Sequence, residues 1–125
     1  MLNKILVCPV CLNKFIHQNN TLICPECKCK YVIKSGIVKL ITPDLDEKTK
    51  KALTDYEKLH KTAWNKIDDG SYEILASFAR GNKTVDIACG DGYIEALVPN
   101  TIGVDFSYHA LLKARKKGAK YLVQA

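Results

Sequence analysis

Residues 83–92 have the sequence Lys-Thr-Val-Asp-Ile-Ala-Cys-Gly-Asp-Gly, a β-prone apolar run that ends in a glycine-rich turn. The run predicts a strand over residues 83–87, and the segment after it predicts a short helix over residues 91–97. Gly90 and Gly92 suit the turn because glycine adopts positive φ and, lacking a Cβ atom, lets the backbone come close to a ligand. This order of elements is typical of α/β folds that bind ligands at the carboxyl edge of a parallel sheet.

The rest of the C-terminal segment continues the alternation of strand and helix. Residues 102–105 predict a second strand, residues 107–117 a helix with a serine cap and a glycine stop, and residues 121–123 a third strand. The order β-α-β-α-β predicts a parallel sheet with crossover helices. We therefore expect an α/β protein in which residues 83–125 form a partial Rossmann-like sheet with flanking helices.

The middle segment, residues 44–82, is predicted to be helical. Pro43 suits a first helical position, and the acidic residues after it favour a helix N-terminus. The apolar face of this first helix is expected to hold the residues that recur at steps of three and four, namely Leu53, Tyr56, Leu59, Ala63, Trp64 and Ile67. A second helix is predicted over residues 72–80, with Ser71 as its cap and Gly81 as its stop.

The N-terminal segment, residues 1–43, is rich in cysteine and lysine. Its β-prone runs, residues 31–33 and 37–41, flank Ser35–Gly36, which predicts a hairpin turn. So short a segment buries too little apolar surface for a large core of its own, so a bound metal is expected to supply much of its folding free energy. We therefore predict a small metal-dependent β domain in front of the helical segment.

Two C-P-x-C knuckles in this segment, Cys8-Pro-Val-Cys11 and Cys24-Pro-Glu-Cys27, are separated by twelve residues. Two residues between cysteines let one tight turn direct both sulfurs to the same point, and two such turns complete the tetrahedral shell of a zinc ion. We therefore predict a structural Zn2+ site with Cys8, Cys11, Cys24 and Cys27 as ligands. Two disulfides or buried free thiols are the alternatives, and Cys29 is an alternative ligand in place of Cys27.

The two knuckles, followed by Tyr31 and by Ser35-Gly36-Ile37 with its apolar strand, resemble the zinc ribbon of the small protein that activates several tRNA, rRNA and protein methyltransferases. The same ribbon also occurs fused in front of bacterial and archaeal methyltransferase domains. The resemblance covers residues 5–42. This sequence departs from it at Lys28 and Cys29, where relatives usually have glycine and a polar residue.

The chemistry of the glycine turn depends on the acid that follows the second strand. Asp105 lies nineteen residues after Asp86, and a carboxylate at that point can accept hydrogen bonds from both ribose hydroxyls of a nucleoside. A dinucleotide fingerprint needs glycine or alanine three residues after its second glycine position. This sequence has Glu95 there if the motif is read from Gly90, and Tyr93 if it is read from Ala88. No Gly-Lys-Ser/Thr follows, which excludes a phosphate-binding P-loop. A glycine turn of an unrelated α/β protein is the alternative.

Residues 85–92 resemble motif I of class I methyltransferases of the type-11 family, with Ala88 in place of the first glycine. The resemblance implies that the chain binds S-adenosylmethionine, with Asp86 fixing the loop and the methionine end and with Asp105 holding the ribose. It further implies that the loop passes beneath the methionine moiety and that Phe106 lies beside the adenine. The cofactor-binding residues that it implies are Asp86, Ala88, Cys89, Gly90, Gly92, Asp105 and Phe106. Cys89 is expected to pack as a small apolar side chain rather than to act as a nucleophile.

A complete class I domain has about seven strands, more than residues 83–125 supply. We therefore expect a truncated or split chain that lacks the strand next to residues 83–87, and no catalytic residue can be assigned. This strand would then have an open edge, which a protein partner or self-association would complete. The predicted partners are this one and a methyl acceptor, either RNA or a small molecule.

Bulk properties narrow the function further. The formal net charge is +6, and residues 1–43 hold six lysines and one acid, an excess that permits a nucleic-acid partner without requiring one. Apolar runs are too short for a membrane span and no signal peptide is visible, so a cytoplasmic location is expected. The sequence thus predicts a methyltransferase, a transferase enzyme, or a truncated portion of one. The alternatives are an inert zinc-ribbon activator module for a partner methyltransferase or RNA, and an RNA-binding ribbon alone.

Overall fold

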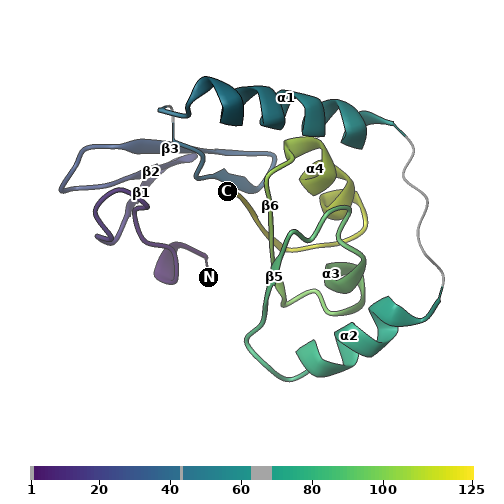
Figure 1. Ribbon diagram of the computed structural model, residues 1–125. Coiled ribbons are helices and arrows are strands. Elements are labelled where there is room, and N and C mark those ends of the chain that lie inside the picture. Colours follow the sequence, from purple (N-terminus) through teal and green to yellow (C-terminus); the bar gives the residue numbers. More distant parts are fainter. Residues whose placement is uncertain (1, 43, 63–68) are drawn as a thin grey trace.

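The computed structural model describes residues 2–42, 44–62 and 69–125 as a mixed α/β fold (Figure 1). The strands are β1 (Ile16–Gln18), β2 (Thr21–Ile23), β3 (Lys30–Lys34), β4 (Ile37–Lys39), β5 (Val85–Ile87), β6 (Ile102–Asp105) and β7 (Tyr121–Gln124). The helices are α1 (Glu47–Lys61), α2 (Ser71–Ala79), α3 (Tyr93–Leu97) and α4 (Tyr108–Lys116), preceded by a 3-10 turn, η1 (Leu2–Lys4). The described strands form one sheet in the order β1-β2-β3-β4-β7-β6-β5.

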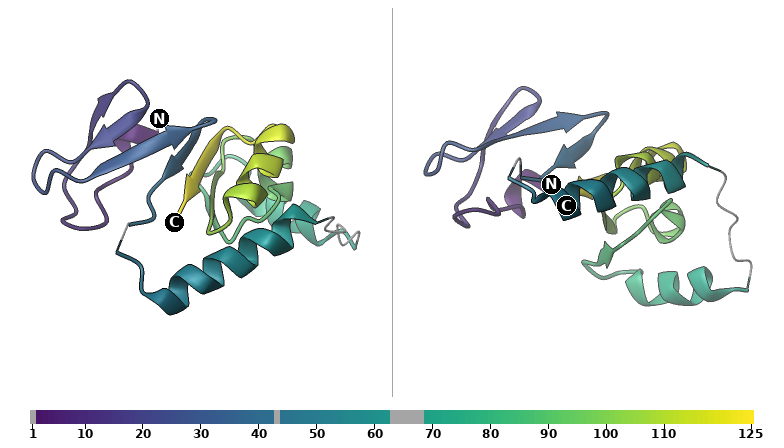
Figure 2. Two further views of the ribbon diagram at one scale, coloured as in Figure 1. Left: turned by 90° about the horizontal axis from the view of Figure 1, so that it is seen from above. Right: turned by 45° about the horizontal axis from the view of Figure 1, so that its top comes forward.

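One half of this sheet is antiparallel and the other half is parallel. Strands β1 to β4 form consecutive antiparallel pairs, and the β3–β4 turn at Ser35–Gly36 has positive φ at both residues, which confirms the predicted hairpin. Strands β5, β6 and β7 pair in parallel, as the alternation of elements predicts. Strands β1, β2 and β3 lie at one end of the molecule, and α2 and α3 lie at the other (Figure 2).

The two halves are joined by a parallel pairing of β4 with β7, in which Val38 lies opposite Val123. Both side chains are buried in a core that also contains Tyr31 and Cys8. The Rossmann-like arrangement predicted from the sequence is therefore only partly matched. The three parallel strands are present, but the outer neighbour of the third strand is a strand of the cysteine-rich hairpin, so residues 1–43 and 83–125 share one sheet.

The elements of the parallel half begin and end near their predicted limits. Strand β6 has the predicted bounds, while β5 and α3 each begin two residues later than expected. Ser107 caps α4 by accepting a hydrogen bond from the backbone N–H of Ala110, and Gly118 follows the helix with φ of 105°. Helix α4 packs against β6 and β7 and therefore covers one face of the parallel strands. Helix α1 packs against α4 in turn.

Helix α1 begins at its cap, Asp46, whose carboxylate accepts a hydrogen bond from the N–H of Thr49 at 2.8 Å. The predicted start at Pro43, and the part of the predicted apolar face at Ala63, Trp64 and Ile67, lie outside the described residues. Helix α2 begins at Ser71 itself. Ser71 does not cap it; the N-cap is Gly70, in the left-handed conformation, and Asp69 accepts the N–H of Ser71.

Strand β5 forms an edge of the sheet, as predicted, with β6 as its partner among the described strands. The Thr84 carbonyl accepts the N–H of Ile102, so by the alternation of a strand the polar backbone groups of Val85 and Ile87 face away from β6. The side chains of Val85 and Ile87 are 53% and 80% exposed. No helix in the described part of the chain is long and apolar enough to cross a membrane.

Candidate metal centre and ligand cleft

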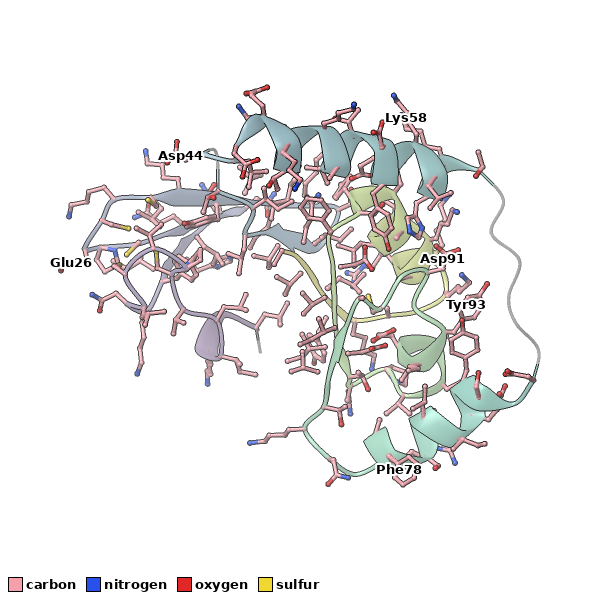
Figure 3. The ribbon with its side chains drawn as sticks, viewed as in Figure 1. Glu26, Asp44, Lys58, Phe78, Asp91 and Tyr93 are labelled. Atoms are coloured by element: carbon pink, nitrogen blue, oxygen red, sulfur yellow. The ribbon has the colours of Figure 1, made fainter. Side chains whose placement is uncertain are left out.

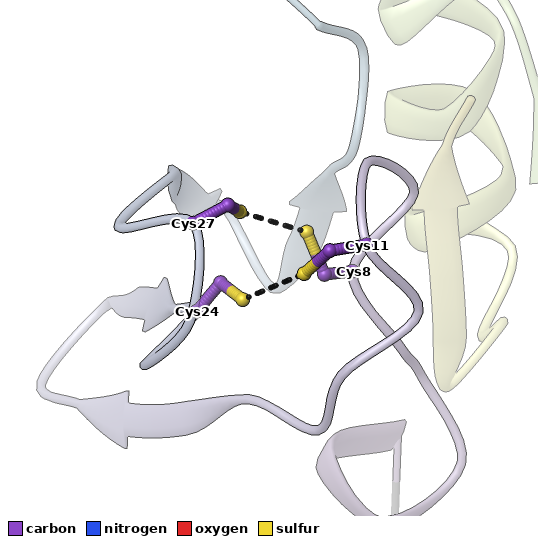
Figure 4. Close-up of side chains that lie close together, drawn as sticks. All are labelled: Cys8, Cys11, Cys24 and Cys27. Atoms are coloured by element: carbon purple, nitrogen blue, oxygen red, sulfur yellow. Dashed lines mark hydrogen bonds between the residues drawn. The ribbon is translucent and has the colours of Figure 1, made fainter.

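The sulfur atoms of the two knuckles converge on one point (Figure 4). The Sγ atoms of Cys8, Cys11, Cys24 and Cys27 all lie within 4.8 Å of one another, with Cys8 3.5 Å from Cys27 and Cys11 3.3 Å from Cys24. A zinc ion at about 2.3 Å from four sulfurs requires sulfur–sulfur separations of about 3.8 Å. The cluster is therefore suited to a tetrahedral metal ion, with the four ligands predicted from the sequence.

The two knuckles have the same backbone conformation. The Cys8 carbonyl accepts the N–H of Leu12, and the Cys24 carbonyl accepts the N–H of Lys28. The residue that closes each turn is left-handed, with φ of 60° at Leu12 and 62° at Lys28. Neither residue is glycine, so each turn contains a conformation that costs about 1 kcal/mol for an L-residue and that the surrounding structure must stabilise.

The electrostatics of the cluster distinguish its inner cysteines from its outer ones. Burial opposes the ionisation of Cys8, but the backbone amides of Cys11 and Val10 and the Cys27 thiol outweigh it and lower the Cys8 pKa to about 6. The pKa of Cys24 is lowered in the same way, whereas those of Cys11 and Cys27 are raised. A metal ion that takes four thiolates would displace the protons that these thiols hold.

Cys29 is outside the converging set, although it lies next to it. Its carbonyl accepts the N–H of Cys24 at 2.9 Å, and its side chain packs against the core beneath the knuckles. No disulfide joins any of the six cysteines. The ring of Tyr31 connects the cluster to the sheet, because its hydroxyl lies 3.9 Å from Cys8 Sγ and its ring packs edge-on against Phe15.

The glycine loop after β5 is held by the acid at the end of β6. The N–H of Gly90 donates to Oδ2 of Asp105 at 2.8 Å, and the N–H of Ser107 donates to Oδ1 at 2.7 Å. The sequence predicts that Asp105 and the loop meet at the carboxyl edge of the sheet, and they do. The Asp105 side chain is 2% exposed, however, so its carboxylate organises the loop and has only its remaining lone pairs for a ligand.

Two adjoining cavities lie over this loop. One, of about 300 Å³, is lined by the loop residues Asp86, Ala88, Cys89, Gly90 and Asp91, and by Tyr56, His60, Tyr72, Leu75, Tyr93 and Ile94. The other, of about 370 Å³, is lined by Ala52, Tyr56, Ala88, Asp105 and Phe106. Tyr56 and Ala88 belong to both linings, so we treat the two as one cleft, called the loop cleft below.

Six of the seven predicted cofactor residues therefore line the loop cleft, and Gly92 does not. A Cβ atom on Gly92 would lie 2.4 Å from the Cβ atom of Ala114, so this glycine allows α3 to pack against α4. Burial strongly raises the pKa of Cys89, which keeps it a thiol and fits the predicted packing role rather than a nucleophilic one.

Helices α1 and α2 supply cleft residues that sequence reasoning did not single out. Tyr56 and His60 come from α1, and Tyr72 comes from α2 and stacks against Tyr93. Asp91 and Tyr93 lie on the side of the loop between these helices (Figure 3). The apolar periodicity of residues 44–67 identified Tyr56 only as a core position, and nothing local indicates that it covers a loop more than thirty residues away.

Two acids fix α1 to the loop and to the N-terminus of α4. Glu57 of α1 accepts hydrogen bonds from Ser107 Oγ, from the N–H groups of Tyr108 and His109, and from the His109 ring. Burial opposes its ionisation, but these hydrogen bonds, led by that of the His109 ring, lower its pKa. Asp91 is buried and lies 3.5 Å from the His60 ring and 3.7 Å from the ammonium groups of Lys113 in α4 and of Lys117, the C-cap residue of that helix.

The chemistry of the loop cleft follows from its lining. Among the described residues that line the 300 Å³ cavity are three tyrosines and two carboxylates, and no lysine or arginine. Tyrosine faces and carboxylates attract cations, whereas a phosphate would need basic side chains or a P-loop. Lys117 already faces the Tyr93 ring and Asp91. The groups that would attract a ligand with an aromatic part and a positive charge are therefore Asp86 and the rings of Tyr56 and Tyr72.

A larger cavity of about 840 Å³ lies elsewhere, between η1 and the N-terminal ends of β5, β6 and β7. It contains none of the residues predicted for the cofactor or the metal. No known protein family matches this sequence, and no curated protein is similar to it. Function is therefore inferred from the geometry of the cysteine cluster and the loop cleft.

Proposed function

We propose that this chain binds S-adenosylmethionine in the loop cleft and is a methyltransferase of the class I, type-11 kind, or a portion of one, with a zinc ribbon built into its sheet. The observation that carries the proposal is the lining of the 300 Å³ cavity, in which tyrosines and carboxylates lie beside a glycine loop with no lysine or arginine among the described lining residues. S-Adenosylmethionine combines a planar adenine with a sulfonium and an ammonium group. A nucleotide carrying phosphates would suit the same cavity poorly.

In this activity, the chain would bind the cofactor and position it. The cofactor supplies an activated methyl group on its sulfonium, so methyl transfer needs mainly an acceptor held in line with it. The methionine end of the cofactor would lie on a floor formed by four residues of the glycine loop and the strand before it, namely Asp86, Ala88, Cys89 and Gly90. Asp105 and Phe106 lie in the adjoining cavity, toward the nucleoside. No side chain is assigned to the chemical step, and the acceptor is RNA or a small molecule.

The zinc ribbon has a structural role in this proposal. Zn2+ held by the four knuckle cysteines would order the hairpin whose last strand, β4, pairs with β7. Strand β7 in turn pairs with β6, which ends in the acid that holds the glycine loop. Metal binding therefore supports the loop cleft through three neighbouring strands, without an open coordination position for catalysis.

A second candidate function is a binding module in which the loop cleft is inert. The observation that favours it is the burial of Asp105, whose two oxygens already accept backbone N–H groups where the enzyme hypothesis places the ribose. In this reading the ribbon contacts a partner methyltransferase or RNA. Lys28, Lys30 and Lys34 are exposed on the ribbon and would make phosphate contacts that weaken steeply with salt.

Calorimetric titration of S-adenosylmethionine into the zinc-loaded chain distinguishes the two functions. The enzyme hypothesis predicts micromolar binding that Tyr56→Leu weakens roughly tenfold, because the variant keeps an apolar side chain but loses the aromatic face over the cleft. Tyr108→Leu is the matched control, since Tyr108 lies outside both cavities, beside Lys34 and Lys39. Heat that is absent at millimolar ligand rejects the enzyme hypothesis and favours the module. Asp105→Ala is a poor probe, because it also releases the loop.

A further inference from the structure

Glu95 of α3 is a fully buried acid that the sequence does not single out. Its side chain is 0% exposed, and neither carboxyl oxygen has a well-aligned hydrogen-bond partner in the described part of the chain. A charged carboxylate in such a position is costly unless it is paired or protonated. We therefore expect Glu95 either to be protonated or to interact with a specific partner.

The space for Glu95 is made by a missing side chain on β6. Gly103 lies opposite Asp86 of β5 and Leu122 of β7, so these three positions are level on the sheet. A Cβ atom on Gly103 would lie 3.2 Å from Cδ of Glu95 and 2.9 Å from Sγ of Cys89. The carboxyl group of Glu95 thus lies above Gly103, on the face of the sheet that also carries the Asp86 side chain, and Asp86 lines the cleft.

Glu95 is fully buried and Asp86 is half-buried, and two neighbouring carboxyl groups in such a place cannot both ionise freely; pairs of this kind share a proton. Burial and the Asp86 carboxylate raise the pKa of Glu95 to about 7, and burial also raises that of Asp86. The other titratable groups that act on the pair are Asp105, which is a further negative charge, and the Cys89 thiol. The nearby ammonium groups of Lys113 and Lys117 face Asp91 instead.

We propose that Asp86 and Glu95 hold a single proton between them when the loop cleft is empty, and that a nucleoside ligand bearing a sulfonium or ammonium group displaces it. The O–H bond of Glu95 breaks, its electron pair stays on the carboxylate, and the proton passes to a buffer base. The pair changes from one negative charge to two as the ligand brings its positive charge. Glu95 is then a positioning and specificity residue that acts through Asp86. This inference rests on the proposed function.

Proton release is measured by titrating S-adenosylmethionine into the zinc-loaded chain at pH 6.5 in phosphate and in ACES, two buffers that hold this pH and whose ionisation enthalpies differ. We expect release of between about half of a proton and one proton per ligand, and an affinity that rises about tenfold between pH 6 and pH 8 as the proton ceases to compete. Glu95→Gln keeps the shape and a hydrogen-bond donor toward Asp86 but has no proton to lose. It should release none, and its affinity should not change over this range.

The outcomes separate the two proposals. Binding by the wild-type chain without a buffer-dependent enthalpy overturns the proton exchange and leaves the cofactor site standing. Equal proton release by Glu95→Gln, or by adenosine, which has no cationic group, also overturns it. Failure of S-adenosylmethionine to bind at any pH overturns both. A carbon-13 titration of the Glu95 carboxyl group in the ligand-free chain needs no variant, and a midpoint near the ordinary glutamate pKa of about 4.3 would reject the shared proton.

Discussion

The backbone N–H of Gly90 donates a 2.8 Å hydrogen bond to Oδ2 of Asp105, which joins the loop after β5 to the end of β6. The other carboxylate oxygen accepts the N–H of Ser107, so one buried side chain satisfies two backbone donors at the carboxyl edge of the sheet. This acid is therefore a structural support of the loop cleft, whatever contact it makes with a ligand.

Asp105→Asn should destabilise the fold by about 2–3 kcal/mol, because one carboxylate oxygen becomes an N–H₂ group that faces a backbone donor in a buried site. Urea unfolding of the zinc-loaded variant measures this loss. Asp55→Asn, on the exposed face of α1, is the matched control and should change the unfolding free energy by less than about 0.5 kcal/mol. Equal unfolding free energies of the two variants would show that the hydrogen bond between Gly90 and Asp105 does not stabilise the fold.

Parts of this architecture are accessible from the sequence because they depend on short-range spacing. The C-P-x-C turns fix where their own sulfurs point, and the alternation of strand and helix places Asp105 and Gly90 at the same edge of the sheet. The pairing of β4 with β7 is different. It joins residues 37–39 to residues 122–124, and nothing in either run specifies the other as its neighbour.

The cleft shows the same division. Its floor follows from a local motif, whereas its walls come from α1 and α2, whose apolar periodicity indicates only that they pack against something. Glu95 could not be found by pattern either, since an acid on a short helix ordinarily faces solvent. Gly103 is the one local sign, because a glycine inside a strand often marks a close approach by another group.

Removal of a knuckle cysteine should release the metal, whereas removal of the neighbouring thiol should not. We expect Cys24→Ser to lose most of its bound zinc on dialysis, because only three of the four converging sulfurs remain. Cys29→Ser should retain one zinc ion per chain. Elemental analysis of the dialysed proteins gives both values, and loss of zinc from Cys29→Ser would place Cys29 in the ligand set.

Chelation of the metal should disturb the parallel half of the sheet as well as the ribbon. The reason is that β4 belongs to the hairpin that follows the cysteine cluster and also pairs with β7. Hydrogen exchange of the Leu122 and Val123 amides should therefore become faster when zinc is removed. Protection that is unchanged at β7, with protection lost only in residues 5–34, would indicate that the two halves are energetically independent.

Gly103→Ala should destabilise the chain by about 1–3 kcal/mol through overpacking. Its new Cβ atom would lie 2.9 Å from Cys89 Sγ and 3.0 Å from Leu122 Cδ2, both in a closely packed region. Cys89→Ala removes the nearer of these atoms, so the double variant should recover part of the loss in a double-mutant cycle of unfolding free energies. Strictly additive effects would show that the two groups do not meet.

The open edge of β5 should promote pairing with a second copy of the chain. Val85 and Ile87 expose both their side chains and their backbone groups at this edge, and unpaired strand edges of this kind associate. Sedimentation velocity over a range of concentrations should therefore show self-association that Ile87→Lys reduces. Phe78→Lys is the control, because Phe78 is 74% exposed and points away from the molecule on α2 (Figure 3). A greater effect of Phe78→Lys would assign the association to the helix.

The buried acid also makes fold stability depend on pH in a defined direction. The pKa of Glu95 is raised from an unfolded value near 4.5 to about 7, so the folded chain binds this proton more tightly than the unfolded chain does. Stability from this group is fully present below pH 4.5 and is lost as the pH rises toward 7, by an amount on the order of 2–3 kcal/mol. Glu95→Gln removes the loss, so it should be more stable than the wild type at pH 8 and similar to it at pH 5. The difference between the two proteins in urea unfolding isolates this effect, since the cysteines titrate in both. A difference that does not grow between pH 5 and pH 8 would mean that Glu95 stays ionised in the fold.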